Sequence, residues 1–390
     1  MRKGTIDYSL LIVTLILVVF GLIMVLSSSY YMAQASADYA YDGLGLFKKQ
    51  LLGAALGIAG MVFFMLLDYR KLMKARYFFL IASLVLLILV FVPGVGVELN
   101  GASRWVRFGS SYSIQPSEIA KFALIIFTSS TIYINRNRMN TFRYGIIPNL
   151  LVLAVICGLL LLQPNYSAII LMCLLVFVLM FVGGAKGWHL AALGGVGGVA
   201  GVVLMIAEPY RVQRLLSFSD PWQYATDGGF QVIQSLYGIG AGGIFGRGLG
   251  EGRQKYLWLP YGESDFIFSI TTEELGLIGA IVLIALYIFL VYRGIKIAAN
   301  SPDLFGTLLA AGITTVIGIQ VVINIGVVTA SVPATGVSLP FLSYGNWSLM
   351  ILLCMIGILL SISRRSRRIR MKAGEQADAN DDMSDMEEAY

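Results

Sequence analysis

The chain has 390 residues, of which 57% are hydrophobic and only 13% carry a charged side chain, and its net charge is +6. Soluble domains usually contain about 25% charged residues, and the mean hydropathy of this chain is +0.79, so a soluble multidomain enzyme is excluded. We expect an all-α integral membrane protein, because the apolar runs do not alternate in polarity as the strands of a membrane barrel would.

Ten apolar runs follow one another along the chain. A helix needs about 20 residues to cross about 30 Å of hydrocarbon, so each run predicts one transmembrane helix. The first run is too long for the apolar part of a cleaved signal peptide and is expected to remain as a helix. The predicted spans are residues 8–27, 51–67, 77–93, 116–134, 146–162, 168–183, 189–207, 275–293, 304–323 and 346–363.

Lysine and arginine are distributed unevenly between the connections. With the N-terminus inside, the cytoplasmic segments hold 18 basic residues and the outer segments nine, so the positive-inside rule predicts that both termini are cytoplasmic. Residues 1–365 are expected to form the transmembrane domain. Residues 366–390 begin basic, end acidic and have little apolar surface to bury, so we predict a disordered cytoplasmic tail there.

Two outer connections are long enough to carry a function. Residues 94–115 form the first, and residues 208–274 form the second, which we call the outer loop. Connections longer than about 15 residues without structure of their own are uncommon in compact proteins unless they are functional. Because the outer loop is rich in glycine and aromatic residues, parts of it are expected to be short amphipathic or re-entrant helices against the membrane.

The fourth predicted span contains two charged residues. Glu118 and Lys121 are three residues apart and therefore share one helix face, and a charge near the bilayer centre costs at least about 2.5 kcal/mol. We predict a mutual ion pair that faces a polar cavity. Two interpretations stay open: a structural pair that fixes helix packing, and a support for an outward-facing site, since SIQPSEIAK begins at the outer end of this helix.

The outer loop contains five basic residues on the side of the membrane where they are unusual. Guanidinium groups match phosphate oxygens, which favours an anionic partner such as a pyrophosphate or an anionic lipid. The alternative is a loop whose eight acids simply balance its bases. The basic residues are Arg211, Arg214, Arg247, Arg253 and Lys255.

Three other signals point away from cofactor chemistry. The stretch GIGAGG matches a dinucleotide-binding fingerprint only formally, because no strand–helix–strand unit surrounds it. The three cysteines lie inside apolar runs without the spacing of a zinc site, and the single histidine, His189, starts a predicted helix. We therefore expect no organic cofactor and no nucleic-acid partner, and proton transfer falls to carboxylates, lysine or tyrosine.

The outer loop ends in the stretch PYGESDFIFSITTEELG, which contains Asp265. Phe266, Ile267 and Phe268 follow it, so this carboxylate is expected at an apolar boundary. Such a setting raises the pKa of a carboxyl group and suits it to accept a proton near neutral pH. Although a loop aspartate is usually only solvated, Asp265 is the candidate for a catalytic base.

Six stretches along the chain form a distinctive ordered set. They are NGASRWVRFGSSYSIQPSEIAKFA (100–123), PYRVQRLLSFSDPW (209–222), GFQVIQSLYGIGAGGIFGRGLGEGRQK (229–255), ESDFIF (263–268), EELG (273–276) and NIGVVTASVPATGVSLPFLSYG (324–345). Together they resemble the SEDS family (shape, elongation, division and sporulation), which includes RodA, FtsW and SpoVE. The similarity covers nearly all of residues 8–365, and the outer loop is closer to FtsW and SpoVE than to RodA.

The resemblance implies a peptidoglycan glycosyltransferase of the bacterial cytoplasmic membrane, which joins lipid II to a growing glycan chain and releases undecaprenyl pyrophosphate. By position in the motifs, Asp265 corresponds to the family's essential aspartate, read as a base, and Glu118 and Lys121 to its functionally important pair. Candidates for binding the substrate or its pyrophosphate are Arg104, Arg211, Arg214, Arg247, Arg253, Lys255, Ser343 and Tyr344.

The resemblance also implies partners. These are a class B penicillin-binding protein, which is a transpeptidase, and other membrane proteins of the division or elongation machinery. A divalent metal, magnesium or manganese, would assist departure of the pyrophosphate, with Asp265 as a candidate ligand, although no ligand spacing proves it. Two alternative functions are a lipid II flippase and a non-catalytic scaffold for division or sporulation.

Two positions depart from the family pattern. Members usually read QPDxG after the fifth span, whereas this chain reads QPNYS, with Asn165 and Ser167 at the changed positions. A carboxylate at that point therefore cannot be the catalytic one here. Members also read SYGG where this chain has SYGN, so that Asn346 and Trp347 are expected to alter the packing of the last outer loop.

Overall fold

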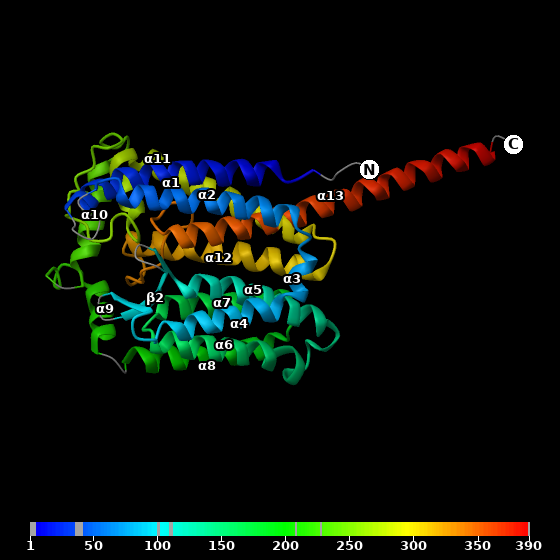
Figure 1. Cartoon of the computed structure of the whole chain (residues 1–390), viewed down its shortest axis with the longest axis horizontal. Coiled ribbons are helices and arrows are strands. Elements are labelled where there is room, and N and C mark those ends of the chain that lie inside the picture. The colour runs from blue at the N-terminus through cyan, green and yellow to red at the C-terminus, as the bar shows by residue number, and fades with distance from the viewer. Residues whose placement is uncertain are drawn as a thin grey trace.

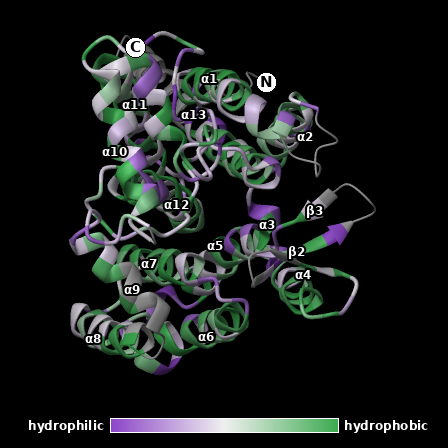
Figure 2. Ribbon diagram, turned by 90° about the vertical axis from the view of Figure 1, so that its left-hand side faces the viewer, coloured by the Kyte–Doolittle hydropathy of each residue, from purple (hydrophilic) through white to green (hydrophobic). Residues whose placement is uncertain are grey.

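The computed structural model describes residues 5–35, 42–99, 102–108, 112–206, 209–226 and 228–388. Long helices lie side by side in a bundle, and the last helix extends far beyond it (Figure 1). The helices of the bundle are mostly hydrophobic, and hydrophilic residues gather in the connections (Figure 2). This is the arrangement of a helical membrane protein, in which each helix satisfies its own backbone hydrogen bonds.

A helix is present at each of the ten predicted spans. Seven helices are long and apolar enough to cross a membrane, and Arg76–Leu89, Tyr166–Val182 and Gly187–Val203 are shorter apolar helices. The helices at the predicted spans are α1 (Tyr8–Ala35), α2 (Gly45–Leu66), α4 (Arg76–Leu89), α5 (Pro116–Ile134), α6 (Ile147–Leu162), α7 (Tyr166–Val182), α8 (Gly187–Ile206), α11 (Ile267–Ala299), α12 (Leu304–Val328) and α13 (Asn346–Glu388).

Shorter elements occupy the end of the bundle that carries the outer loop. The outer loop contains two of the short helices that were expected there, α9 and α10 (Figure 1). A three-stranded antiparallel sheet in the order β1-β2-β3 precedes α5, and the sequence analysis did not predict it. The elements are α9 (Pro209–Ser219), α10 (Phe230–Gly242), β1 (Gly96–Leu99), β2 (Ala102–Phe108) and β3 (Tyr112–Ile114).

The helices differ in how much of their surface faces other helices. Helix α5 is buried along almost its whole length, including Ala120, Leu124 and Ile126. Helix α8 is the opposite case, because Val196 and Val199 on it are exposed. The bundle therefore has a central helix at α5 and an edge helix at α8, whose exposed apolar side chains suit contact with lipid.

Helix α11 begins earlier than the predicted eighth span, because residues 267–274 at the end of the outer loop are also helical and buried. The helix is interrupted at Gly276, which has a φ of +69°. A Cβ atom at Gly276 would lie 2.3 Å from the backbone nitrogen of Gly246, so only glycine allows this close approach. The break separates a buried outer segment of α11 from its long apolar segment.

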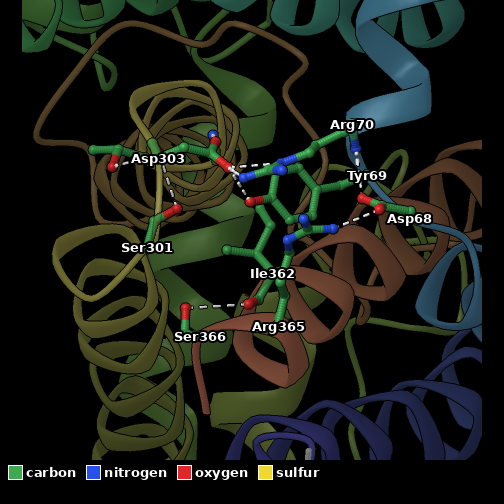
Figure 3. A network of polar contacts seen from close by, with 10 residues as sticks. Asp68, Tyr69, Arg70, Ser301, Asp303, Ile362, Arg365 and Ser366 are labelled. Atoms are coloured by element: carbon green, nitrogen blue, oxygen red, sulfur yellow. Dashed lines mark hydrogen bonds and ion pairs between the residues drawn. The ribbon is translucent and has the colours of Figure 1, made fainter. Parts of the chain in front are cut away.

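The opposite end of the bundle is fixed by a polar network around Asp303 (Figure 3). The Asp303 carboxylate caps α12 by accepting from the backbone nitrogen of Gly306 at 2.8 Å, and it also accepts from the Tyr69 hydroxyl at 2.6 Å. Arg70 in α3 (Arg70–Lys74) forms an ion pair with it at 2.7 Å. Burial, reinforced by Asp303, raises the pKa of the Tyr69 hydroxyl above its ordinary value.

Residues 366–388, for which the sequence predicts a disordered tail, are drawn as a continuation of the last helix, and the disorder stays a prediction. Helix α13 continues through them to Glu388, away from the bundle (Figure 1). These residues include many alanine, glutamate, methionine and arginine residues, which have high helix propensity. They also extend a helix that is already formed, so no new nucleus is needed.

Candidate functional site

Asp265 lies one residue before the N-cap of α11, at the end of the outer loop. Its side chain is half-buried, and Phe266, Ile267 and Phe268 after it are buried, so the predicted apolar flank is confirmed. Its carboxylate oxygen Oδ2 would lie 3.3 Å from a Cβ atom at Gly336, where φ is +69°. The left-handed backbone at this glycine brings the segment 336–345 close to the carboxylate.

Asn324 of α12 holds the main chain at Asp265. Its side-chain nitrogen donates to the carbonyl oxygen of Asp265 at 2.7 Å and to that of Val337 at 2.8 Å. Asn324 is only 1% exposed, and removing its amide would leave the buried carbonyl oxygen of Val337 without this donor, which is costly. One side chain therefore fixes both the catalytic candidate and the segment that faces it.

The segment 336–345 makes two further contacts with the residues before Asp265. The Ser343 hydroxyl donates to the carbonyl oxygen of Ser264 at 2.6 Å. The backbone nitrogen of Tyr344 donates to the carbonyl oxygen of Glu263 at 2.9 Å. Ser343 is buried and its hydroxyl also accepts a backbone hydrogen bond. These contacts hold the segment 336–345 against the residues before Asp265, and substrate binding by Ser343 stays a prediction.

A second carboxyl group, that of Glu263, lies beside Asp265 in a different environment. Glu263 is 8% exposed. Burial raises the pKa of its carboxyl, and the charge of Asp265 raises it further. A Glu263 that tends towards the neutral acid adds little repulsion to a charge on Asp265, so the two neighbours are suited to different protonation states.

Glu118 and Lys121 form the predicted ion pair, with 2.7 Å between Glu118 Oε1 and Lys121 Nζ. Both side chains are buried, and Glu118 Oε2 accepts from the Ser348 hydroxyl of α13 at 3.1 Å. Glu118 lies in the first turn of α5, where the helix dipole favours a negative charge. The pair is therefore near a helix end, not at the helix centre, and it joins α5 to the start of α13.

Lys255 is not available to a ligand. Its side chain is 2% exposed and its ammonium lies 2.9 Å from Glu274 Oε1 and 3.1 Å from the Ser27 hydroxyl. Glu274 in turn accepts from that hydroxyl at 2.8 Å and from the backbone nitrogen of Gly250 at 3.0 Å. This buried cluster ties the outer loop to α1 and α11.

Glu273 binds the same stretch of the outer loop from the next position of α11. It is 1% exposed and accepts from the backbone nitrogens of Arg253 at 2.9 Å and Gln254 at 3.1 Å. Arg247 lies 3.8 Å from it. Sequence reasoning did not foresee that Glu273 and Glu274 anchor the loop, although two adjacent acids before a glycine inside an apolar run were a usable signal.

The remaining basic candidates have different surroundings. Arg253 is exposed, and the side chains of Arg211 and Arg214 in α9 lie outside the described residues. Arg104 is partly buried and donates to the carbonyl oxygens of Gln163 at 3.3 Å and Pro164 at 2.5 Å. Arg104 therefore links the sheet to the turn between α6 and α7, which is a structural use of its charge.

The two departures from the family pattern have local structural roles. Asn165 is the N-cap of α7 and accepts from the backbone nitrogen of Ala168 at 3.4 Å, a role for which asparagine serves as well as aspartate. The Ser167 hydroxyl donates to the carbonyl oxygen of Thr335, beside the segment 336–345. Asn346 begins α13, where the backbone of Gly53 packs closely against it.

The described residues contain no group of three or more histidine, cysteine, aspartate or glutamate side chains that could hold a metal ion. The predicted divalent metal stays a prediction. A magnesium site built from one or two carboxylates together with substrate phosphates remains compatible with Asp265.

A family model described as a cell cycle protein, covering FtsW, RodA and SpoVE, matches residues 8–368. Stage V sporulation protein E of Bacillus subtilis (strain 168) is 42% identical over 367 residues, which cover 94% of this chain and 99% of that protein. A probable peptidoglycan glycosyltransferase FtsW of Geobacter sp. (strain M18) is 40% identical over 361 residues, covering 93% and 97%.

Solved structures share the fold. A chain of a peptidoglycan synthase complex, described as coordinating polymerization and crosslinking, superposes with a TM-score of 0.73 at 29% identity, covering 93% of this chain and 98% of that one. The rod shape determining protein RodA of Thermus thermophilus gives a TM-score of 0.68 at 28% identity, covering 93% and 97%.

Proposed function

This chain belongs to the FtsW, RodA and SpoVE family of cell cycle proteins, and on that premise we propose that it is a peptidoglycan glycosyltransferase. The observation that carries the proposal is 40% identity, over nearly the whole of both chains, to a probable peptidoglycan glycosyltransferase. The similarity to a sporulation protein and to several FtsW proteins assigns it to cell division or sporulation. Its substrate is lipid II, which it polymerises into glycan strands.

The reaction takes place on the outer face of the bacterial cytoplasmic membrane. All ten apolar helices span the membrane, and both termini are cytoplasmic. The excess of basic residues at one end of the bundle supports this orientation, and so does the presence of Arg70 and of the basic start of the tail at that end. The outer loop and Asp265 then face the compartment in which the cell wall is built.

Asp265 acts as the base. A hydroxyl oxygen of the acceptor sugar attacks the anomeric carbon of the sugar that carries the pyrophosphate. The bond from that carbon to the pyrophosphate oxygen breaks, and the hydroxyl proton passes to the Asp265 carboxylate. Asn324 and Ser343 support this role, because they donate to the main-chain carbonyl oxygens of Asp265 and Ser264 and so hold the backbone at the carboxylate in place. A base held in position contributes through geometry as well as through its pKa.

Positive charge stabilises the departing pyrophosphate. Arg253 is the best placed basic residue of the outer loop for this role, since its side chain is exposed while its backbone is anchored by Glu273. Arg211 and Arg214 are further candidates. A magnesium or manganese ion held by Asp265 and the substrate phosphates would neutralise part of the same charge.

The partner is a class B penicillin-binding protein, whose transpeptidase crosslinks the glycan, together with other membrane proteins of the division or elongation machinery. The similarity to one chain of a peptidoglycan synthase complex supports such an assembly.

The direct test combines the purified protein, its cognate penicillin-binding protein and lipid II, and resolves the glycan polymers on a gel. Polymers that disappear with Asp265→Asn support the proposal. If the wild type moves lipid II across the membrane of liposomes but forms no polymer, a flippase is favoured. If it shows neither activity, a non-catalytic scaffold is the remaining alternative.

A further inference from the structure

A cavity of about 240 Å³ opens at the end of the bundle opposite the outer loop, where α1, α11 and α13 meet. None of its residues takes part in the site around Asp265, which lies at the other end of α11. We call this cavity the basic pocket. Its polar lining residues are Asp7 before α1, Arg293, Lys296 and the C-cap Asn300 of α11, and Ser363, Ser366 and Arg367 on α13.

The lining carries a net positive charge, because three basic residues face a single acid. That acid, Asp7, is already bound: its carboxylate forms an ion pair with Arg293 and accepts from the backbone nitrogen of Leu10 at 3.1 Å. The ammonium group of Lys296 is exposed and has no hydrogen bond or ion pair within the described residues. The pocket therefore contains a positive charge, that of Lys296, which no acid in the described part of the chain neutralises.

Arg293 is already engaged, because its guanidinium pairs with Asp7 and its side chain is only 15% exposed. Its Nε atom is enclosed by the protein, so a molecule in the basic pocket would not contact it. The acceptor oxygens of an anion in the pocket would therefore meet Lys296, whose side chain is exposed.

Two exposed apolar stripes lead away from the pocket along the bundle. On α1 the stripe consists of Tyr8, Ile12 and Ile16, which are spaced four residues apart, so they lie on one helix face. On α11 the stripe consists of Tyr292 and Ile288, which are also exposed and four residues apart. Tyrosine at the pocket level followed by isoleucine is typical of the membrane interface and the lipid-facing surface below it.

We propose that the basic pocket binds the phosphate head group of an anionic phospholipid from the cytoplasmic leaflet, whose acyl chains lie along the stripes of α1 and α11. The leaflet follows from the orientation proposed above. Basic pockets between transmembrane helices on the cytoplasmic side suit such head groups. A soluble phosphate shares the head-group chemistry, but it would not use the apolar stripes. The bound lipid joins the ends of three helices that are far apart in the sequence.

The test uses the purified full chain in detergent and measures bound lipid by native mass spectrometry, with phosphatidylglycerol as the anionic probe and phosphatidylcholine as the neutral one. The wild type should retain phosphatidylglycerol in preference. Lys296→Gln should weaken that binding about fivefold, the factor expected for one basic residue near a membrane surface. Lys296→Glu should weaken it further, because it reverses the charge.

Lys74→Gln is the matched control, since Lys74 is also an exposed lysine at this end of the bundle but lies on α3, outside the pocket. It should bind phosphatidylglycerol as the wild type does. Equal retention by the wild type and Lys296→Glu would overturn the proposal. A second arm adds inorganic phosphate with phosphatidylcholine only. If phosphate alone raises the Tm of the wild type but not of Lys296→Gln, the ligand is soluble and the lipid assignment is wrong.

Discussion

Asp265 lies fewer than ten residues before Glu273 and Glu274 at the junction of the outer loop and α11, but the protein binds these carboxylates in different ways. Glu273 and Glu274 are 1% and 0% exposed, and each binds backbone nitrogens of the outer loop through its side chain. Asp265 is placed differently: its side chain is half-buried, and Asn324 of α12 donates to its main-chain carbonyl oxygen.

The difference distinguishes carboxylates that hold the fold together from a carboxylate that is placed to contact a ligand. A carboxylate whose oxygens are occupied by backbone donors and a buried lysine holds a loop in place, and it cannot easily take a proton from a substrate. A carboxylate carried on a fixed main chain keeps its position while its side chain can still meet a ligand. On this comparison Glu273 and Glu274 support the fold, and Asp265 stays the candidate for the catalytic base.

The largest effect on folding is expected from breaking the Lys255–Glu274 pair. Lys255→Met leaves Glu274 buried without its counter-charge, and removing one partner of a buried ion pair costs about 3–5 kcal/mol. The yield of detergent-stable monomer and its Tm should fall sharply. The double variant Lys255→Met with Glu274→Gln should recover much of the loss, because no buried charge remains. If the single variant is as stable as the wild type, Glu274 has no anchoring role.

A smaller effect is expected at Glu118 and Lys121. Lys121→Met strands Glu118, but Ser348 and the first turn of α5 still stabilise that carboxylate, so we expect a loss of about 1–3 kcal/mol. Changing both residues, with Glu118→Gln, should fold better than the single change. A double variant that folds but does not polymerise lipid II makes the pair functional. Normal polymerisation by both variants would make it dispensable.

The smallest effect concerns Glu263 and appears only as a dependence on pH. Because its pKa is raised in the folded protein, its contribution to stability is complete below the ordinary pKa of glutamate and is lost as the pH rises through the folded value. Relative to Glu263→Gln, the wild type should therefore lose Tm as the pH rises. Parallel pH profiles of the two proteins would show that Glu263 does not titrate in this way.

Much of the helical framework could be predicted from the sequence. Apolar run length depends on local composition, so a helix is found at each predicted span, and the spacing of Glu118 and Lys121 was enough to predict their ion pair. The apolar flank of Asp265 was likewise visible in the three residues that follow it.

Contacts between distant segments could not be predicted. The ion pair of Lys255 with Glu274, and its hydrogen bond to Ser27, join three parts of the chain, and nothing near Lys255 in the sequence reveals its burial. The binding of Ser343 to Ser264 is of the same kind. The three-stranded sheet was missed because its strands are short and lie in a connection that the hydropathy pattern does not describe.

The central claim, that Asp265 is the base, is tested most directly by Asp265→Asn in the lipid II polymerisation assay with the cognate penicillin-binding protein. The change preserves size and removes the basic oxygen, so folding and partner binding should survive. Polymer formation should fall by about 10²–10⁴-fold, the usual contribution of a general base. A wild-type yield of polymer from the folded Asp265→Asn protein would contradict the account and return the search to Glu263, Glu273 and Glu274.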